Sequence, residues 1–345
     1  MKPRIAVSVG CPSGIGPEVA VVAAAAESHA RLLLVGDEGA LRLAAKGRGI
    51  PVSRLVRVAG PQDAWALRDG GIAVWQPTGD LSPRDRVAGS PSRAAGAAQL
   101  AWIDAACDLV STGAADALTT GPVSKEAIAR SGGRTALAFL GHTEHLQRRL
   151  RAREVVMAFW SPVLVTSLAT THLPLARVPR AVKREAVARA AFWLAWLLSK
   201  VQRKAPRVAV ASLNPHAGEG GLLGHEEQTE IMPGIALARA RLSRSHVAAT
   251  LDGPVPAESA LRLALGEDRR ERRWDGVVAM YHDQATIPMK LSGFGDAVNV
   301  SLGLPIVRTS VDHGTGYDRA GTWKADARGL VAALALAAKL AAATR

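Results

Sequence analysis

The sequence of 345 residues contains only two cysteines, Cys11 and Cys107, and they lie far apart along the chain. Two thiols cannot build a disulfide framework, and their spacing does not match a zinc knuckle. No CxxC or HExxH motif is present, so the sequence carries no short-range zinc signature. The shortage of cysteine favours a reducing, cytoplasmic location.

The sequence also lacks an apolar run long enough to cross a bilayer, which requires about 20 residues. The apolar segment 190–201, "AAFWLAWLLSKV", is shorter and reads as a buried helix. The N-terminus begins basic and then turns apolar, as a signal peptide does, but Pro12, Pro17 and Glu18 interrupt the apolar stretch. We therefore expect neither a signal peptide nor a membrane partner.

Aromatic residues make up only 4% of the chain, and its basic residues form no long run. The net charge is nevertheless +13, with 43 Lys and Arg against 30 Asp and Glu. A nucleic-acid-binding protein of this charge is expected to carry a basic arm or a basic strand studded with aromatic residues, and neither is present. We therefore expect no nucleic-acid partner. The charge reflects either an arginine-rich composition or a basic surface that attracts anionic substrates.

The familiar nucleotide-binding motifs are missing as well. The segment 10–16, "GCPSGIG", follows a predicted strand and precedes a predicted helix, a context that suits an anion at a helix N-terminus. Its spacing is not GxGxxG and no GK[ST] follows, so neither a Rossmann fingerprint nor a P-loop is present. A dinucleotide would have to bind by another route, and the sequence does not identify the residues that contact it.

What the chain does contain is a regular alternation of strand-like and helix-like segments. Hydrophobic residues make up 48% of the 345 residues, enough for a sizeable core and for two α/β domains. The alternation predicts α/β layers with a largely parallel sheet, in which ligands bind at the carboxyl ends of strands. The predicted strands include 4–10, 30–37, 115–122, two within 155–174, 207–219 and 274–284. The predicted helices include 16–29, 93–110, 184–201, 258–265 and 329–344.

Three of the nine histidines share one setting. His172, His216 and His282 each follow an apolar segment and begin a loop, so three strand ends could converge on one point. Three neutral imidazoles suit a divalent transition metal with open positions for substrate. Alternatively, each histidine caps a loop or binds a backbone carbonyl. Four glycines between 218 and 224 permit positive φ or a close approach to a ligand, although a plain flexible loop is the other reading.

Other polar residues suggest an anion site. His142 and Thr143 lie in a glycine-led loop and could donate to phosphate oxygens, or Thr143 could simply cap a helix. Lys290 and Arg308 could hold an anionic group, Arg308 in a bidentate manner, and Asn299 could donate to it. These residues interrupt apolar segments, which argues against a merely solvated surface because polar groups in such segments are usually partnered.

Carboxylates accompany these groups. Asp283 follows His282 directly, and Asp312 precedes His313. Either carboxylate could orient an imidazole or act as a base.

Long motifs along nearly the whole chain resemble the 4-hydroxythreonine-4-phosphate dehydrogenase family of vitamin B6 biosynthesis. In order, they are "GCPSGIGPEV", "TGPVSKEAI", "GHTEHL", "THLPL", "LNPHAGEGG", "DGPVPAES", "AMYHDQATIPMK", "GFGDAVNVSLGLP" and "TSVDHGTGYDRAGTWKAD". The resemblance implies an α/β fold of two α/β/α domains around a central cleft, like isocitrate and isopropylmalate dehydrogenases. We expect the first domain to comprise 1–133 and 309–345, and the second, with the dimer interface, to comprise 134–308.

The resemblance also implies a homodimer with shared active sites, NAD or NADP as cofactor, and one divalent metal ion: zinc, cobalt, magnesium or manganese. The family's metal-binding histidines match His172, His216 and His282, the last contributed by the partner subunit. The family's substrate-binding residues match His142, Thr143, Lys290, Asn299 and Arg308.

The implied reaction oxidises the C3 hydroxyl of 4-phosphooxy-L-threonine and then releases carbon dioxide, giving 3-amino-2-oxopropyl phosphate. A divalent cation would favour the alkoxide, and the phosphate would supply binding energy remote from the reacting carbon. Asp283 and Lys125 are the candidate general bases.

Three alternatives to this reaction stay open. One is the sister activity on 4-phospho-D-threonate or D-erythronate, since "GCPSGIGPE", "TGPVSKEA", His145 and His225 depart from the usual family pattern. Another is a dihydrodiol dehydrogenase, which Lys290 and Arg308 disfavour because its substrate lacks phosphate. The third belongs to a different class, a non-enzymatic basic α/β binding module.

Overall fold

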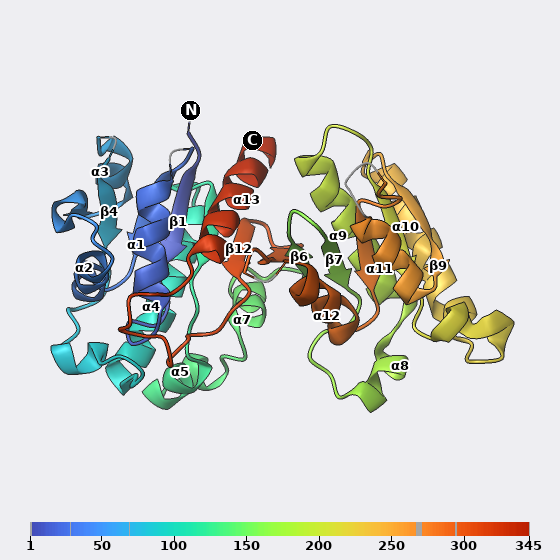
Figure 1. Ribbon diagram of the computed structural model, residues 1–345, viewed down its shortest axis with the longest axis horizontal. Helices are drawn as coiled ribbons and strands as arrows, with labels where there is room; N and C mark the ends of the chain where they lie inside the picture. Colours follow the sequence, from blue (N-terminus) through green and yellow to red (C-terminus); the bar gives the residue numbers. More distant parts are fainter. Residues whose placement is uncertain (1, 28, 69, 267–270, 294, 345) are drawn as a thin grey trace. The chain divides into compact units, whose positions relative to one another are not determined.

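The computed structural model describes residues 2–27, 29–68, 70–266, 271–293 and 295–344. They form two compact units (Figure 1). Unit 1 comprises Met1–Arg153 and Leu304–Arg345, and unit 2 comprises Glu154–Gly303. Both are α/β, which confirms the predicted fold class.

The borders of the units differ from the predicted 133/134 and 308/309. Residues 134–153 belong to unit 1 because their helices pack there: His145 Nε2 lies 2.6 Å from Asp104 Oδ1 in a neighbouring helix of the same unit. The segment 304–308 belongs to unit 1 because it leads into a strand that pairs with a central strand of that unit. Side-chain and ladder contacts of this kind are not visible in a hydrophobicity pattern.

Unit 1 contains six parallel strands in the order β3-β4-β2-β1-β5-β12. Their bounds are β1 (Arg4–Ser8), β2 (Arg31–Val35), β3 (Leu55–Arg57), β4 (Ile72–Trp75), β5 (Ala117–Thr120) and β12 (Val307–Val311). The central strands are buried on both faces, which explains their continuous apolar sequence.

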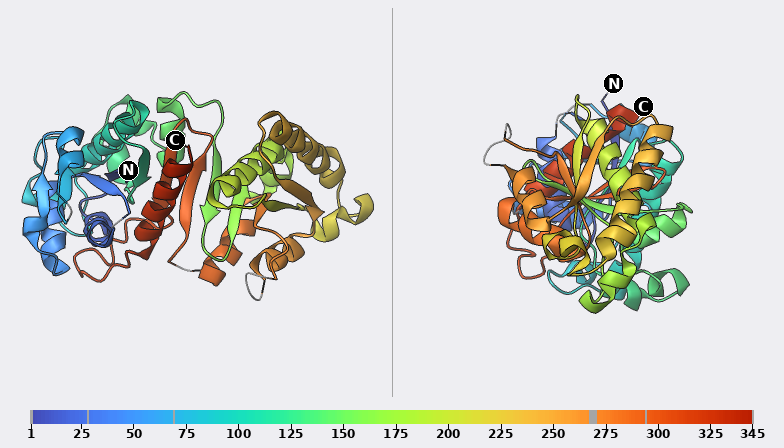
Figure 2. Two further views of the ribbon diagram at one scale, coloured as in Figure 1. Left: turned by 90° about the horizontal axis from the view of Figure 1, so that it is seen from above. Right: turned by 90° about the vertical axis from the view of Figure 1, so that its right-hand side faces the viewer.

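Helices cover both sides of these strands (Figure 2). α1 packs against α2 and α13, whereas α4 packs against β1 and α5. β1 and β5 lie side by side where the strand order reverses, the usual place for a ligand in such sheets. The helices of unit 1 are α1 (Gly16–Ala26), α2 (Glu38–Gly47), η1 (Val52–Arg54), α3 (Pro61–Ala66), η2 (Pro83–Arg86), α4 (Arg93–Ser111), α5 (Lys125–Ser131), α6 (Arg134–Leu137), α7 (His142–Arg149) and α13 (Arg328–Thr344).

Unit 2 also contains six strands, in the order β11-β6-β7-β10-β8-β9. β6 runs antiparallel to both of its neighbours, and the pairs from β7 to β9 are parallel. Its strands are β6 (Val156–Trp160), β7 (Val165–Leu168), β8 (Arg207–Ala211), β9 (Thr250–Val255), β10 (Gly276–Ala279) and β11 (Val298–Leu302). The predicted pair of strands within 155–174 is therefore confirmed as an antiparallel hairpin.

The helices of unit 2 include a long apolar one, α9, which contains the segment 190–201 and is largely buried. α10 and η5 pack on α9, and α11 and α12 pack on β10. No helix in the part of the chain that the structure describes combines the length and the apolar character needed to span a membrane. The set is η3 (Leu175–Arg177), α8 (Val178–Ala181), α9 (Arg184–Val201), η4 (Pro215–Gly221), η5 (Glu227–Ile231), α10 (Met232–Arg244), α11 (Ala257–Leu265) and α12 (His282–Gly293).

The order β7-β10-β8 positions the histidines. These three strands are adjacent and parallel, so their carboxyl ends lie along one edge of unit 2, about 4.8 Å apart from strand to strand. His172, His216 and His282 follow the three strand ends within a few residues. The fold thus places the three strand ends side by side, but His282, which was expected to begin a loop, is instead the first residue of α12.

Candidate functional site

The three loops at this edge of unit 2 are joined by hydrogen bonds. Thr170 Oγ1 donates to the carbonyl oxygen of Met280 at 2.7 Å, which ties the β7 loop to the β10 loop. Gln284 Nε2 donates to the carbonyl oxygen of Ser212 at 2.9 Å, which ties α12 to the β8 loop. The Gln284 side-chain oxygen also accepts from the Met280 amide at 2.7 Å. One glutamine side chain therefore holds two of the three loops in register.

His172 and His282 lie close together. Their ring centroids are 5.4 Å apart, and the ring planes meet at 44°. His282 Nδ1 lies 2.8 Å from Asp283 Oδ1 and 3.4 Å from Thr286 Oγ1, and the edge of Phe159 packs against its ring. A partner at Nδ1 fixes the ring orientation and leaves Nε2 for a ligand. Asp283 is thus placed to orient His282.

His216 lies in an unusual turn. His216 has φ 51° and ψ 29°, and Ala217, Gly218, Glu219 and Gly220 also have positive φ. The imidazole is exposed. The predicted role of the glycines in providing positive φ is confirmed at Gly218 and Gly220, and the turn extends the same conformation to residues that carry a Cβ.

The fit of these residues to a metal ion is partial. Two imidazoles whose rings lie 5.4 Å apart can occupy two positions around one cation, since zinc–nitrogen bonds are about 2.1 Å long. Within the described ranges of the chain, however, no group of three or more His, Cys, Asp or Glu side chains is arranged to hold a metal ion. One chain therefore offers a histidine pair, with His216 on the neighbouring loop.

Unit 1 carries a separate cluster of polar groups, which begins with His142 at the start of α7. The His142 ring is buried, and its Nε2 has no hydrogen-bond partner among the residues that the structure describes. Burial, with further contributions from Arg308, His145 and Lys125, holds the pKa of His142 well below its ordinary value of 6.5. The imidazole is therefore neutral near pH 7, and one of its nitrogens is available to a ligand.

Arg308 adds a buried positive charge to this cluster. The side chain is 3% exposed, on β12, and its Nη2 donates to Thr120 Oγ1 at 2.7 Å. Burial lowers the pKa of Arg308 to about 9, and the negative charge of Glu144 opposes that effect only in part. An incoming anion would favour the charged guanidinium, which can bind phosphate with two parallel hydrogen bonds.

Lys125 and Glu144 flank Gly141, the residue before α7. A Cβ at Gly141 would lie 2.9 Å from Glu144 Oε2 and 3.6 Å from Lys125 Nζ. Glycine therefore allows both side chains to approach the start of the helix. Thr143, the next residue of α7, is buried. We call His142, Thr143, Lys125 and Arg308 the cationic cluster of unit 1.

The remaining predicted residues, Lys290 and Asn299, belong to unit 2. Lys290 is exposed near the end of α12. Asn299 in β11 is the direct cross-strand neighbour of Phe159 in β6, so the two side chains share a face of the sheet. Since Phe159 packs against His282, Asn299 lies on the side of the sheet that carries α12.

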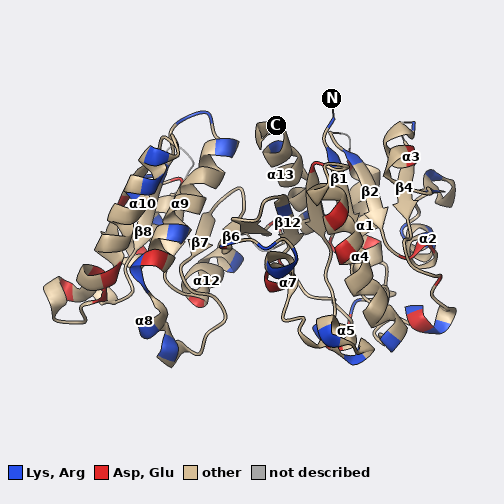
Figure 3. Ribbon diagram, turned by 180° about the vertical axis from the view of Figure 1, so that it is seen from behind, with Lys and Arg blue, Asp and Glu red and all other residues tan. Residues whose placement is uncertain are grey.

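The basic residues do not gather into a single strip. Figure 3 shows Lys and Arg spread over α5, α7, α8 and α10, interspersed with Asp and Glu. Several of them form ion pairs, such as Arg149 with Asp108 at 2.7 Å and Lys183 with Glu230 at 2.9 Å.

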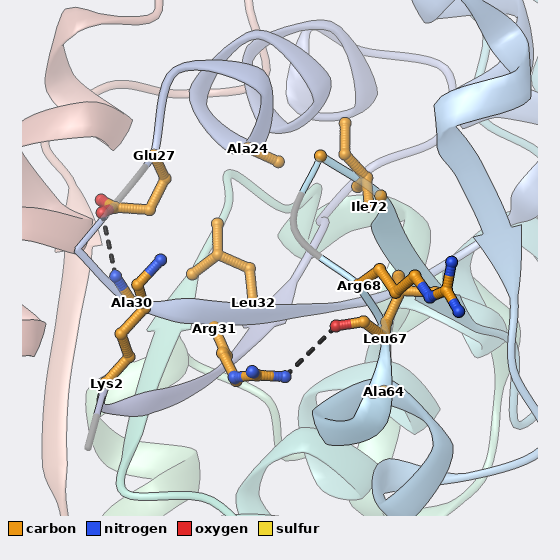
Figure 4. Close-up of a pocket in the computed structure, with 12 residues that line it drawn as sticks. Lys2, Ala24, Glu27, Ala30, Arg31, Leu32, Ala64, Leu67, Arg68 and Ile72 are labelled. Carbon is orange, nitrogen blue, oxygen red and sulfur yellow. Dashed lines mark hydrogen bonds between the residues drawn. The ribbon is translucent and has the colours of Figure 1, made fainter.

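Unit 1 also has two cavities. One, of about 260 Å³, lies at the amino ends of β2 and β4, away from the cationic cluster (Figure 4). Its Arg31 donates to carbonyl oxygens at the end of α3, so this arginine serves to cap a helix. The other, of about 140 Å³, lies beside the loop after β1 and is lined mainly by apolar groups, including Trp323 and part of Glu18.

Comparison with known proteins decides the family. The family model for "Pyridoxal phosphate biosynthetic protein PdxA" matches residues 28–337. The chain belongs to the PdxA family. Its family relatives include the 4-hydroxythreonine-4-phosphate dehydrogenase of Desulfosudis oleivorans, 40% identical over 340 residues, which cover 97% of this chain and 95% of that protein. The corresponding protein of Geobacter metallireducens is 40% identical over 347 residues, 99% of this chain and 96% of that protein.

Solved structures of PdxA relatives agree with the fold. The crystal structure of 4-hydroxythreonine-4-phosphate dehydrogenase from Klebsiella pneumoniae has a TM-score of 0.83 at 32% identity, covering 99% of this chain and 98% of that one. A terephthalate 1,2-cis-dihydrodiol dehydrogenase from Burkholderia xenovorans has a TM-score of 0.67 at 30% identity, covering 98% of each chain. The fold is therefore shared by proteins whose names specify different substrates.

Two residues of this PdxA chain contact the predicted site residues or their loops but were not themselves predicted from the sequence. Thr120, which binds Arg308, ends the predicted strand 115–122, and its position at a carboxyl strand end was the available signal. Glu227, which is 3% exposed, binds the loop that carries His216. No sequence pattern distinguishes this buried glutamate from its neighbour Glu226.

Proposed function

We propose that this PdxA-family chain is a 4-hydroxythreonine-4-phosphate dehydrogenase. It would oxidise the C3 hydroxyl of 4-phosphooxy-L-threonine with NAD or NADP and then release carbon dioxide to give 3-amino-2-oxopropyl phosphate. The observation that carries the proposal is the buried Arg308 beside the neutral, ligand-ready His142. The relatives that are 40% identical over nearly the whole chain bear the name of this activity.

The phosphate anchor follows from the chemistry of the cationic cluster. Arg308 is held in a buried position where its charge is destabilised, so a phosphate dianion there would gain more than at the surface. His142 Nε2 and the Thr143 hydroxyl group supply polar atoms of the kind that pair with phosphate oxygens. Binding energy from this remote group lowers the barrier by positioning the reacting carbon.

We propose, from the resemblance to the family, that a divalent cation is held by His172 and His216 of one chain and His282 of a second copy. Within one chain the close imidazoles are those of His172 and His282, and the described residues form no group of three ligands, so a second copy would complete the site. When bound, such a cation stabilises an alkoxide and polarises a carbonyl. The role of Asp283 in this arrangement is to hold Nδ1 of His282 at 2.8 Å and so to direct the other nitrogen outward.

The proposed homodimer has support from exposed apolar side chains beside all three histidine loops. Leu175 follows the β7 loop and is 70% exposed, and Leu222 follows the β8 loop and is 84% exposed. Ile287 and Leu291 lie on α12 and are 58% and 84% exposed. Apolar groups exposed around functional loops are typical of surfaces that a protein partner covers. Sedimentation equilibrium of the purified protein, with a Leu222→Glu, Leu291→Glu variant as the dissociated control, tests the dimer.

The general base is one of two side chains. Asp283 already binds His282, whereas Lys125 lies in the cationic cluster of unit 1. We therefore propose Lys125 as the group that handles the alcohol proton. Lys125→Met should lower kcat by at least about tenfold, because the loss of a general base typically costs that much or more. An Asp283→Asn variant with the same loss and a normal cation affinity would contradict the assignment.

The activity is tested by following NADH or NADPH formation with 4-phosphooxy-L-threonine, with and without a metal chelator. Parallel assays with 4-phospho-D-threonate and 4-phospho-D-erythronate separate the sister activity, and mass spectrometry of the product tests decarboxylation. Reconstitution of chelated protein with zinc, cobalt, magnesium or manganese identifies the cation. Salt-sensitive binding of a polyanion without any cofactor reduction would instead favour the non-enzymatic binding module.

A further inference from the structure

The turn that carries His216 is left-handed over five consecutive residues. From His216 to Gly220, φ lies between 45° and 79°. Ala217, Glu219 and His216 itself are not glycine, and each carries a steric penalty in this conformation. A run of such residues persists only where neighbouring groups stabilise it. The turn must therefore be held by contacts with other residues.

The far end of the turn is held by Gln228 Nε2, which donates to the Gly220 carbonyl oxygen at 3.1 Å, and by the Leu223 amide, which donates to the Gly218 carbonyl oxygen at 3.1 Å. One buried carboxyl group holds its entrance. Glu227 Oε1 accepts from the backbone amides of Leu213 at 2.9 Å and Asn214 at 2.8 Å. Glu227 Oε2 accepts from Asn214 Nδ2 at 2.9 Å. A Cβ at Gly218 would lie 2.8 Å from the same Oε2, so the turn wraps closely around this carboxyl group. Glu227 therefore binds the residues that enter the turn and lies close to its middle, at Gly218.

The neighbouring Glu226 provides a contrast. It also accepts from Asn214 Nδ2, at 2.7 Å, but its backbone partners are the amides of His225 and of Glu226 itself, outside the turn, and it is only partly buried. Because both carboxyl groups need the same NH₂ group as a donor, the Asn214 amide cannot flip to suit a change at one of them. A substitution at Glu227 must therefore be absorbed by the loop backbone.

We propose that Glu227 is a positioning residue that holds the left-handed turn and so aims His216 along the carboxyl edge of unit 2. Of the three histidines, His216 is the one whose backbone conformation the sequence pattern does not determine. The hydrogen bonds to Glu227 offset the strain of its turn. The inference rests on the proposed function only in so far as His216 is a cation ligand. The conformation of the loop is independent of that role.

The test compares Glu227→Gln with Glu226→Gln in the full-length protein. Hydrogen exchange of a peptide covering 213–221, measured without ligand, reports the loop, and titration calorimetry with Co²⁺ alone reports the cation site. In Glu227→Gln the amides of Leu213 and Asn214 should exchange at least about tenfold faster, since hydrogen bonds to a charged acceptor are lost. Co²⁺ affinity should fall about tenfold or more, as for other groups that orient a ligand. Glu226→Gln should match the wild type in both.

A rescue variant separates positioning from general stability. Adding Ala217→Gly and Glu219→Gly to Glu227→Gln removes the steric penalty at those two positions. The added glycines should restore Co²⁺ affinity toward the wild-type value. The inference is overturned if Glu227→Gln exchanges as slowly as the wild type, if Glu226→Gln has an equal effect, or if the glycines rescue nothing. If the wild type neither binds Co²⁺ nor reduces a cofactor, the proposed function fails, and the exchange data alone decide the role of Glu227.

Discussion

Replacing Arg308 with methionine should stabilise the unliganded protein and abolish its affinity for phosphate. The side chain is 3% exposed, and burial lowers its pKa to about 9. The charged guanidinium is therefore held at a cost in free energy that methionine, of similar length, does not incur. A site that stabilises its ligand at the expense of the empty protein is typical of binding residues.

The magnitude follows from the pKa. A fall from 12.5 to about 9 sets an upper bound of about 5 kcal/mol, at about 1.4 kcal/mol per pKa unit. Loss of the hydrogen bond to Thr120 costs about 1 kcal/mol, and replacement of buried charges by apolar groups usually stabilises by about 1–4 kcal/mol. We expect a net gain of about 1–3 kcal/mol. Because the folded pKa lies below the unfolded one, the penalty is fully present at neutral pH and declines only as the pH rises above about 9.

Urea unfolding at neutral pH measures the free energy of unfolding of the wild type and of Arg308→Met, with and without inorganic phosphate. Phosphate should stabilise the wild type and leave the variant unchanged, and kcat/KM for the phosphorylated substrate should fall about 100-fold or more. Thr120→Val keeps the charge and removes its partner, so this control should lose stability and retain phosphate binding. A less stable Arg308→Met protein, or one that phosphate still protects, would refute the reasoning.

Three further predictions concern single side chains. His216→Ala should abolish cofactor reduction without changing the circular dichroism spectrum or the melting temperature, because the imidazole is exposed; His225→Ala, in the same segment, is the control and should stay active. In the wild type, the folded protein resists protonation of His142, so the free energy of unfolding should fall as the pH drops below 6.5. His142→Gln should remove part of this loss. Urea unfolding across that pH range measures both proteins. Gly96→Ala should lower the free energy of unfolding by about 1–3 kcal/mol or more, because its Cβ would lie 1.9 Å from a carbonyl oxygen of α5; an unchanged urea midpoint would contradict this packing.

The parts of the fold that the sequence predicted well are those with strong local patterns. The predicted helices at 93–110, 184–201 and 329–344 are confirmed as α4, α9 and α13. Each is long enough for its apolar face to repeat over several turns, and α4 also begins at the expected kind of capping residue, Ser92. The strand ends that carry the histidines were predictable because apolar segments stop there.

Strands that contain functional polar residues were harder to predict. β11 contains Asn299 and β12 contains Arg308, and both interrupt the apolar pattern that identifies a buried strand. The edge strand β9 contains Gly253 and Pro254, residues that ordinarily argue against a strand. In β12 a buried charge is tolerated because Thr120 on the adjacent strand β5 pairs with it. That compensation lies across the sheet and leaves no local signal.

The geometry of the histidines shows a second limit of sequence reasoning. Which loops meet depends on the strand order β7-β10-β8, which no periodicity encodes, and on Gln284, which joins two loops through its side chain. The left-handed turn at His216 depends on Glu227, a residue beyond the end of that turn. Such features are decided by a few long-range hydrogen bonds, so a pattern of residue types predicts the participants and not their arrangement.

The cationic cluster of unit 1 and the histidines of unit 2 are proposed to bind different parts of the substrate, which has a consequence for substrate choice. Arg308 lies in a buried strand and His142 at the start of a helix, so the proposed phosphate anchor is built on regular secondary structure. His172 and His216 are exposed and lie outside the helices that pack on the sheet, whereas His282 begins α12. Phosphothreonine and phosphothreonate share the phosphate and differ in an amine or hydroxyl that would face the cation. Under the proposed function, discrimination between them therefore rests with the unit 2 loops, and substitutions there should alter the ratio of the two activities without altering phosphate affinity.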